Sequence, residues 1–305
     1  MTDRRYDRLV TPALIWIQVT FGAFHVFGKY VVSNMDPMAV AGLRVLGATP
    51  LLLLLAWKVD RIIPQGREWL SLALLGFLGV FANQLLFING LKFTTATNVG
   101  ILMPSIPVFT CAIAALFRVE RIRPAQMLGV ALAVIGALVM LNPFRFTLGN
   151  DTTFGNLLIV GNCLAYAGYL VLQRPVLRRL PPLTVVAYAF LFGGLGVLAV
   201  SGRHVLAIEP ARMPALVWVG IAYSVIFQTT INYALTVWVM KRSTPSVVSS
   251  FNSLQPLVAA ILAAIFLGET FGWREAAGFV LIVGGLLFVT RQREAAPAAP
   301  AASIR

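Results

Sequence analysis

The chain matches itself when its sequence is shifted by 149 positions. The matching residues are those that usually punctuate membrane helices, and they pair as Trp69 with Trp218, Asn83 with Asn232, Lys92 with Lys241, Thr95 with Thr244, Pro107 with Pro256, Glu120 with Glu269, Gly129 with Gly278 and Gly136 with Gly285. Because these pairs keep one register, the sequence predicts two copies of one unit. We expect the first unit to cover 1–145 and the second 146–293.

Apolar runs that could cross a bilayer recur along the whole chain. Hydrophobic residues make up 59% of the sequence and charged residues only 11%, whereas soluble domains carry about 25% charged residues. A span needs about 20 apolar residues. The sequence therefore predicts an all-α polytopic membrane protein, with a disordered cytoplasmic tail at 294–305. We expect ten spans, at 12–31, 38–57, 69–91, 96–117, 124–142, 155–173, 183–200, 214–238, 245–267 and 275–290.

The positive charges fall unevenly on the connections between these spans. If the amino terminus is cytoplasmic, 17 Lys and Arg residues lie on the cytoplasmic side, six lie on the other side, and Arg44 lies inside a span. This asymmetry is typical of a multi-pass protein with both termini inside. It predicts the bacterial inner membrane as the location, and it argues against nucleic acid as the partner that explains the net charge of +13.

Each predicted unit contains five spans, and five is an odd number. The second unit therefore has to lie upside down relative to the first, so that Lys92 and Lys241 fall on opposite sides of the membrane. Inverted repeats are typical of secondary carriers, in which two similar halves expose a central site to each side in turn. The sequence thus predicts transport by alternating access around a central cavity.

The few ionisable groups within the spans bear on how transport would be driven. No Asp or Glu falls in the middle of a span, and His25 and Arg44 are the ionisable groups there. Proton-coupled carriers usually keep an ionisable relay inside the membrane. Facilitated movement down the substrate gradient is the simpler hypothesis. A proton-coupled exporter of drugs or other metabolites, with His25 as the relay, stays as the alternative.

Other function classes find less support in the sequence. No nucleophile-and-base motif marks an enzyme, and no spacing of Cys or His predicts a metal site. We therefore expect neither an enzyme nor a cofactor. A channel would more often be a symmetric oligomer with a filter loop, and the duplicated unit argues against it. The oligomeric state stays open.

Polar and aromatic residues recur at helical spacing within six of the spans. In the sixth span, Asn162, Tyr166 and Tyr169 lie on one helix face. Such residues either line a cavity or form hydrogen bonds between helices. We take the cavity as the hypothesis. The candidate substrate-binding residues are Trp16, Gln18, Phe21, His25, Arg44, Asn83, Gln84, Phe87, Asn98, Asn162, Tyr166, Tyr169, Gln228, Asn232, Asn252 and Gln255.

Prolines and acids mark the fourth and ninth spans. Pro104, Pro107 and Pro256 lie inside these spans, where each removes a backbone donor. They are candidate gating hinges, with passive kinks as the alternative. Glu120 and Glu269 follow the two spans, and each could cap the helix that comes next in the chain.

The ends of the two units resemble a known signature. The segments FRVERIRPAQMLGVALAVIGALVML (117–141) and FLGETFGWREAAGFVLIVGGLLFV (266–289) each carry a Phe and a Glu at a corner, followed by a Gly-rich closing helix. They resemble the drug/metabolite transporter superfamily, EamA type, and the chain is similar in particular to bacterial aromatic amino-acid exporters. The resemblance implies export, and a basket of ten helices in which the fifth helix of each unit packs peripherally.

The predicted cavity also suggests a class of substrate. Amide groups can hold both ends of a zwitterion, and aromatic rings can stack on a side chain or attract an ammonium group. Arg44 could bind a carboxylate through two hydrogen bonds. The sequence therefore favours a neutral or aromatic amino acid, or a similar small metabolite, as the substrate.

Overall fold

The computed structural model describes residues 8–94, 98–99, 102–120, 122–141, 144, 150–258, 261–262 and 273–294. Every regular element among these residues is a helix, because a segment surrounded by hydrocarbon has to pair its backbone groups internally. Five helical segments are long and apolar enough to cross a membrane, namely Pro37–Val59, Glu68–Gly90, Thr152–Val176, Pro182–Leu206 and Ala215–Arg242. The expected all-α, multi-pass membrane fold is confirmed; the tail at 295–305 lies outside the described residues.

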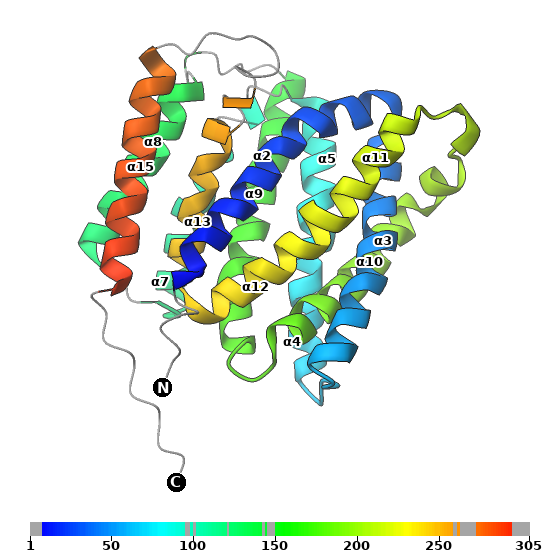
Figure 1. Ribbon diagram of the computed structural model, residues 1–305, viewed down its shortest axis with the longest axis horizontal. Helices are drawn as coiled ribbons and strands as arrows, with labels where there is room; N and C mark the ends of the chain where they lie inside the picture. The colour runs from blue at the N-terminus through cyan, green and yellow to red at the C-terminus, as the bar shows by residue number, and fades with distance from the viewer. Residues whose placement is uncertain are drawn as a thin grey trace.

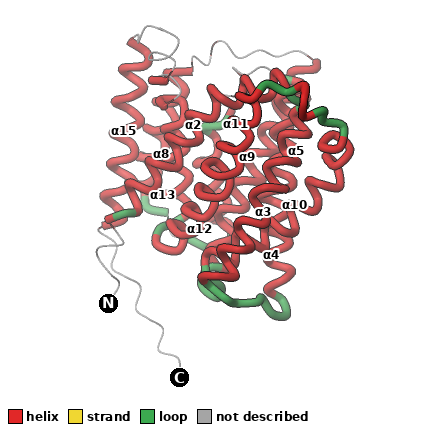
Figure 2. The backbone as a smooth tube through the Cα atoms, turned by 45° about the vertical axis from the view of Figure 1, so that its right-hand side comes forward, coloured by secondary structure: helices red, strands yellow, loops and turns green. Residues whose placement is uncertain are grey.

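Six of the predicted spans are single helices that begin and end close to the expected boundaries. They are α2 (Val10–Asn34), α3 (Pro37–Val59), α8 (Pro124–Leu141), α9 (Asn150–Val176), α10 (Pro182–Leu206) and α15 (Trp273–Glu294). Figures 1 and 2 show them running through one bundle, in which the start of α2 and the end of α15 lie at the same end. A short 3-10 turn (Pro210–Arg212) follows α10.

The third and eighth spans are each interrupted by a π-helical segment. The third consists of α4 (Glu68–Gly76), η1 (Phe77–Ala82) and α5 (Asn83–Phe93), and the eighth of α11 (Ala215–Tyr223), η4 (Ser224–Ile231) and α12 (Asn232–Arg242). The two π segments end 149 positions apart. Single-turn π segments widen a helix and occur often at functional sites.

The fourth and ninth spans are broken into shorter helices. The fourth continues as α7 (Ser105–Leu116), and the ninth begins with α13 (Pro245–Ser250) and a 3-10 turn, η5 (Phe251–Leu254). Pro104 precedes the first residue of α7, and Pro107 and Pro256 lie in the first turn after a break. A proline is tolerated there because the missing N–H would lack a helical partner anyway. These prolines therefore begin helices and do not bend continuous ones.

The fifth spans of the two predicted units pack on each other at one side of the bundle. α8 and α15 cross there in antiparallel directions (Figure 1). A Cβ atom on Gly129 would lie 2.8 Å from the Gly285 carbonyl oxygen, and one on Gly136 would lie 2.8 Å from the Gly278 carbonyl oxygen. The glycines that match under the 149-residue shift therefore let two backbones touch, as small residues often do between membrane helices.

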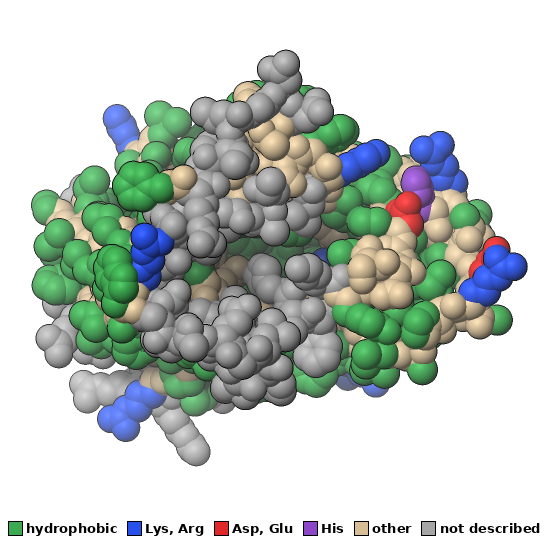
Figure 3. All heavy atoms as spheres, turned by 90° about the horizontal axis from the view of Figure 1, so that it is seen from above, with side chains coloured by type: hydrophobic (Ala, Val, Ile, Leu, Met, Phe, Trp, Pro, Cys, Tyr) green, Lys and Arg blue, Asp and Glu red, His purple; other side chains and the backbone are tan. Residues whose placement is uncertain are grey.

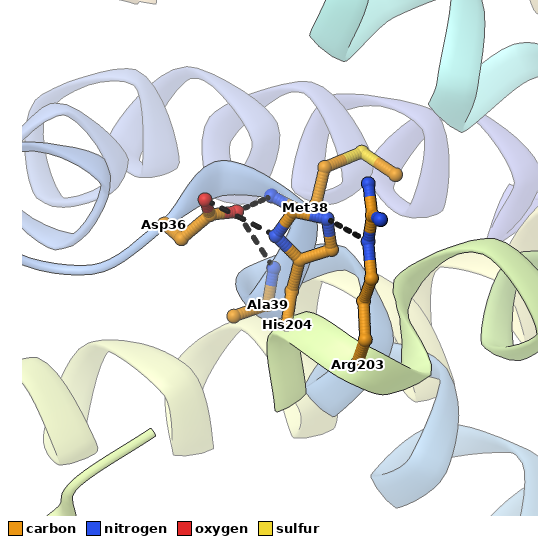
Figure 4. A network of polar contacts seen from close by, with 5 residues as sticks. All are labelled: Asp36, Met38, Ala39, Arg203 and His204. Carbon is orange, nitrogen blue, oxygen red and sulfur yellow. Dashed lines mark hydrogen bonds and ion pairs between the residues drawn. The ribbon is translucent and has the colours of Figure 1, made fainter. Parts of the chain in front are cut away.

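The second and seventh spans, α3 and α10, pack along each other at the opposite side of the bundle. At one end, Asp36 caps α3 by accepting hydrogen bonds from the Met38 and Ala39 N–H groups at 2.7 and 3.2 Å, and its second oxygen lies 3.3 Å from His204 Nδ1 (Figure 4). At the other end, Asp60 accepts from the Thr184 N–H and hydroxyl. A carboxylate thus ties the pair together at both ends.

Glu120 makes a contact that differs from the one expected. One carboxylate oxygen accepts a hydrogen bond from Gln126 in the following helix, at 2.8 Å. The other accepts from the Ser246 N–H at 3.2 Å and from its hydroxyl at 2.8 Å. Glu120 therefore caps α13, in the second half of the chain, where a helix N-terminus attracts an anion. Glu269 lies outside the described residues.

Candidate functional site

Most of the predicted binding residues lie where α2, α3, α5, α9, α12 and the broken ninth span come together. Figure 3 looks down on the end of the bundle where α2 leads into α3, and shows a hollow at the centre of that face. Arg44, Asn83 and Tyr166 are half-buried, and Asn162 and Asn232 are buried. α3 and the helices between the α3–α10 pair and the α8–α15 pair thus bring these side chains toward one region.

Arg44 provides the positive charge in this region. It lies on the side of α3 that carries the buried Ala41 and Ala48, whereas Leu46 is exposed on the outer side. Its Nε and Nη2 groups donate to the Thr229 hydroxyl at 3.3 and 3.2 Å. Its guanidinium carbon lies 5.6 Å from the centre of the Phe24 ring, which is within range of a cation–π contact.

The hydroxyl that contacts Arg44 belongs to the π segment η4. The Thr229 hydroxyl donates to the Ser224 carbonyl oxygen at 2.8 Å, and the Thr230 hydroxyl donates to the Val225 carbonyl oxygen at 2.8 Å. Both bonds reach five residues back, which is the spacing of a π turn. The Thr229 oxygen is therefore left to accept hydrogen bonds from the guanidinium group.

Asn232, which follows η4 directly, connects α12 to α2. Its side chain forms hydrogen bonds with the Thr20 hydroxyl at 2.7 and 3.0 Å and reaches the Ile17 carbonyl oxygen at 3.5 Å. The Tyr223 hydroxyl donates to the Thr20 carbonyl oxygen at 3.1 Å. Asn232 is fully buried, so its hydrogen bonds fix the contact between α2 and α12.

α2 also contacts the ninth span. Gln255 donates from its side-chain nitrogen to the Gln18 oxygen at 2.9 Å. One turn further along α2, a Cβ atom on Gly22 would lie 2.7 Å from the Cβ of Val258, so only glycine permits this approach. Asn252 is half-buried in η5. The amide pair therefore lies at a tight helix contact.

The contact between α9 and the third span resembles the one between α2 and α12. Asn162 donates to the Asn83 carbonyl oxygen at 2.7 Å, and Asn83 follows the π segment η1 directly. The Tyr169 ring lies against Gly79 so closely that a Cβ atom there would overlap it. The Tyr233 hydroxyl donates to the Gly79 carbonyl oxygen at 3.4 Å.

Aromatic rings extend from this contact into the bundle. The Tyr166 and Tyr169 rings stack with centroids 6.2 Å apart, and the Tyr169 and Tyr233 centroids are 6.3 Å apart. Phe190 meets Tyr233 edge-on at 4.8 Å. Tyr166, which is half-buried, is the most accessible of the four. These rings form an apolar wall with hydroxyl groups along it.

Several buried polar groups near these contacts lack a partner among the described residues. They are both side-chain atoms of Gln84 and of Gln173, the Tyr169 hydroxyl and the Gln228 oxygen. Buried polar groups almost always form hydrogen bonds, so a bound water or ligand would be expected to satisfy some of them. Gln84, Tyr169 and Gln228 were among the predicted binding residues. Gln173 was not, but it lies on the same face of α9 as Tyr169.

The structure places other candidates elsewhere. Trp16 is 47% exposed and shares the outer side of α2 with Ile15 and Val19, away from Gln18. Asn98 is buried in a separate cluster, where it donates to Asn156 at 3.1 Å. The expectation that these two line the cavity followed their depth in the membrane, whereas the direction of each side chain depends on helix rotation.

The remaining candidates lie in or near the centre. Phe21 is half-buried on α2, and Phe87 is half-buried on α5 beside the small cluster of Val99 and Ile159. The side chain of His25 lies outside the described residues. Four further residues of the centre were not among the predicted binding residues, namely Phe24, Thr20, Thr229 and Tyr233. Phe24 lies one turn after Phe21, and Tyr233 aligns with Gln84 under the 149-residue shift, so both could have been found.

Two other hollows lie away from this centre, at the end of the bundle where α3 ends and α4 begins. One has a volume of about 460 Å³ and is lined by residues that include Trp57, Arg61 and Tyr188. The second has a volume of about 280 Å³ and is lined by residues that include Arg67 and Arg179. Neither contains a candidate binding residue.

Sequence comparisons relate the chain to a transporter family. The sequence profile of the EamA-like transporter family matches the chain twice, at residues 12–142 and 153–291. The Arabidopsis thaliana protein WALLS ARE THIN 1 is 29% identical, over 91% of this chain and 81% of its own length. An uncharacterized transporter from Archaeoglobus fulgidus is 29% identical over 96% of this chain and 99% of its own length.

A solved crystal structure superposes with a TM-score of 0.78 over 96% of this chain and 99% of its own. At 19% identity this likeness shows the fold alone. The family profile carries more information, because its two matches together cover most of the chain. The chain therefore belongs to the EamA-like transporter family of the drug/metabolite transporter superfamily.

Proposed function

We propose that the protein is a carrier of the bacterial cytoplasmic membrane that exports small metabolites, with neutral and aromatic amino acids as substrates. The observation that carries this proposal is the chemistry of the centre. It combines the Arg44 guanidinium, the Tyr166 and Phe24 rings and unsatisfied amide groups. No described carboxylate lies among them. A zwitterion with an aromatic side chain matches this set.

Alternating access between two inverted units, 1–145 and 146–293, is the mechanism we propose. Three features support it: the family profile matches each half, the two π segments end 149 positions apart, and Asn83 and Asn232 each follow one of them. Halves of similar shape and opposite orientation can exchange conformations, which moves a central site from one side to the other. Pro104, Pro107 and Pro256, at the helix breaks, are the proposed hinges.

The proposed orientation has both termini in the cytoplasm. It rests on the 17 Lys and Arg residues that would then lie on the cytoplasmic side against six outside. In this orientation the hollow of Figure 3 faces the periplasm. Export as the direction follows from the resemblance to bacterial aromatic amino-acid exporters.

Counterflow in proteoliposomes tests the carrier. Vesicles loaded with unlabelled phenylalanine should accumulate labelled phenylalanine above its equilibrium level, because a carrier exchanges one substrate molecule for another. Empty vesicles with the protein, and loaded vesicles without it, are the controls. Uptake that does not depend on internal substrate would indicate a pore. A screen of the other amino acids by competition would then define the substrate range.

We propose that transport runs down the substrate gradient without proton coupling. The acidic residues that the structure describes lie at helix ends and not in the middle of a membrane-spanning helix. Asp36 and Asp60, at the two ends of α3, are examples. Collapsing the pH gradient across the vesicles should leave the initial flux unchanged. A strong dependence on the gradient would contradict facilitated transport and favour the proton-coupled alternative.

A further inference from the structure

We propose that Arg44 is the anchor for a substrate carboxylate, and that the site requires this carboxylate but not an amino group. The substrates would then be small organic acids with an aromatic or apolar body, of which amino acids are only one kind. This inference rests on the proposed carrier function, because it concerns the same central site. It is drawn from the way in which the structure surrounds the Arg44 charge.

A guanidinium group within a membrane span is costly unless its charge is compensated. Arg44 lies two turns into α3 and faces inward. It cannot lose its proton under physiological conditions. The ion pairs among the described residues are His204 with Asp36 and Arg212 with Glu209, and all four lie near helix ends. No carboxylate of the described residues therefore compensates Arg44.

The contacts that Arg44 does make are weak for a charged group. Both hydrogen bonds go to one neutral oxygen, that of Thr229, at 3.2 and 3.3 Å, which is longer than the usual distance for charged donors. The Nη1 group donates to no described residue. Because one edge of the guanidinium faces Thr229 and Phe24 lies 5.6 Å away from its carbon, the Nη1–Nη2 edge is left for a planar acceptor. A carboxylate fits that edge with two parallel hydrogen bonds.

The surroundings offer much less to an ammonium group. An ammonium ion in a membrane cavity needs a carboxylate, or several oxygen or ring acceptors. The described centre supplies hydroxyl groups, amide oxygens and ring faces, but no negative charge, and Arg44 itself repels a cation. The interaction with a carboxylate should therefore dominate the binding of a zwitterion. Removing the amine should cost much less affinity than removing the carboxylate.

Three ligands that share one phenyl ring separate these contributions. Phenylalanine carries both groups, hydrocinnamate lacks the amine, and phenethylamine lacks the carboxylate. Thermal unfolding of the purified full-length protein in detergent reports binding directly, because a ligand that binds the folded state raises the unfolding midpoint. We expect phenylalanine and hydrocinnamate to raise the midpoint, and phenethylamine to leave it unchanged.

Variants of Arg44 test whether this selectivity depends on the guanidinium. Arg44→Gln should weaken the apparent affinity for hydrocinnamate by at least about tenfold, a loss typical of a charged hydrogen-bond pair. Arg44→Lys should retain part of it, because the charge is kept but the planar fork is lost. Arg242→Gln is the matched control: Arg242 also lies over an aromatic ring, Trp238, at 4.2 Å, but at the far end of α12. It should bind all ligands as the wild type does.

Each outcome decides the proposal. It is overturned if phenethylamine stabilises the wild type and hydrocinnamate does not, if no carboxylate stabilises it, or if Arg44→Gln binds hydrocinnamate as tightly as the wild type. Should Arg44→Gln fail to fold, the ligand series on the wild type and on Arg44→Lys still decides. If the carboxylates bind but counterflow is absent, the carrier proposal fails while the assignment of Arg44 stands. If counterflow occurs and Arg44→Gln keeps the ligand selectivity of the wild type, the carrier proposal stands and the assignment of Arg44 fails.

Discussion

At the scale of single residues, the central side chains combine a structural and a proposed binding role. Asn162 and Asn232 are buried and use their amide groups to join helices. Tyr166 is half-buried beside them, and its ring stacks on Tyr169. The first two therefore hold helices together, while the Tyr166 ring stays partly accessible. Substitutions of these residues should act through different properties, folding for the amides and transport for the ring.

Enlarging Tyr166 should block the proposed site. Tyr166→Trp places a larger ring at this half-buried position beside Tyr169, and overpacking of this kind costs about 1–3 kcal/mol where the surroundings cannot give way. We expect counterflow to fall by about tenfold or more while the protein still elutes as a folded species. Leu164→Trp is the control, because Leu164 is 42% exposed on the outside of α9. Equal transport by both variants would remove Tyr166 from the site.

Glu120 should contribute to stability through its contact with α13. Glu120→Ala removes the acceptor for the Ser246 N–H and hydroxyl and for Gln126, and the loss of such charged hydrogen bonds costs about 2 kcal/mol. The midpoint of thermal unfolding should fall. Glu68→Ala is the comparison, because among the described residues the half-buried Glu68 accepts only from the Gln65 N–H. A midpoint unchanged in both variants would show that the Glu120 contact adds nothing.

At the scale of helices, close packing is concentrated where glycine removes the side chain. α8 and α15 meet at Gly129, Gly136, Gly278 and Gly285. The π segments act differently, because they widen α4–α5 and α11–α12 at equivalent points. The pairing of glycines across α8 and α15 could be anticipated from the 149-residue shift. The π segments could not, because their sequences, such as Phe77–Ala82, carry no signal that separates them from ordinary apolar helix.

The α8–α15 crossing should not tolerate a side chain at its contact point. In Gly129→Leu, the Cβ alone would lie 2.8 Å from the Gly285 carbonyl oxygen, so the helices would have to separate. We expect a loss of more than about 2 kcal/mol, measured as a lower unfolding midpoint and lower folded yield. Gly284→Leu on the same helix pair is the control, because nothing lies within 4 Å of its Cβ position. A Gly129→Leu variant as stable as this control would contradict the packing.

At the scale of the whole molecule, the helix pairs α3–α10 and α8–α15 frame the bundle, and the helices between them surround the centre (Figures 1 and 2). α5 and α12 end at opposite ends of the bundle (Figure 1). Lys92 and Lys241, near those two ends, are both exposed. Their places therefore offer a direct test of the proposed inversion.

Labelling of single cysteines should find the two lysine positions on opposite membrane surfaces. In a background without Cys111 and Cys163, Lys92→Cys should react with an impermeant thiol reagent added outside intact cells lacking their outer-membrane barrier. Lys241→Cys should react only after the inner membrane is opened. Labelling of both from one side would contradict inverted units and, with them, alternating access in the form proposed here.

The sequence by itself determined the all-α membrane class, and it carries the self-match at 149 positions and the charge asymmetry. These follow from local composition, because each apolar run partitions into the bilayer largely on its own. It also identified Arg44, Asn162 and Asn232 as polar groups within spans. The depth of a residue along its helix could be predicted in this way, but the rotation of the helix about its axis could not. Trp16, which was expected to line the cavity, is therefore found exposed on the outer side of α2.

Only the tertiary structure decided which groups meet. The contact of Arg44 with Thr229 joins residues 185 positions apart, and that of Glu120 with Ser246 joins residues 126 positions apart. Both depend on how helices from the two halves pack, where glycine allows backbones to approach and where a π segment turns a hydroxyl inward. Such contacts arise from the summed packing of the bundle, which no local stretch of sequence specifies.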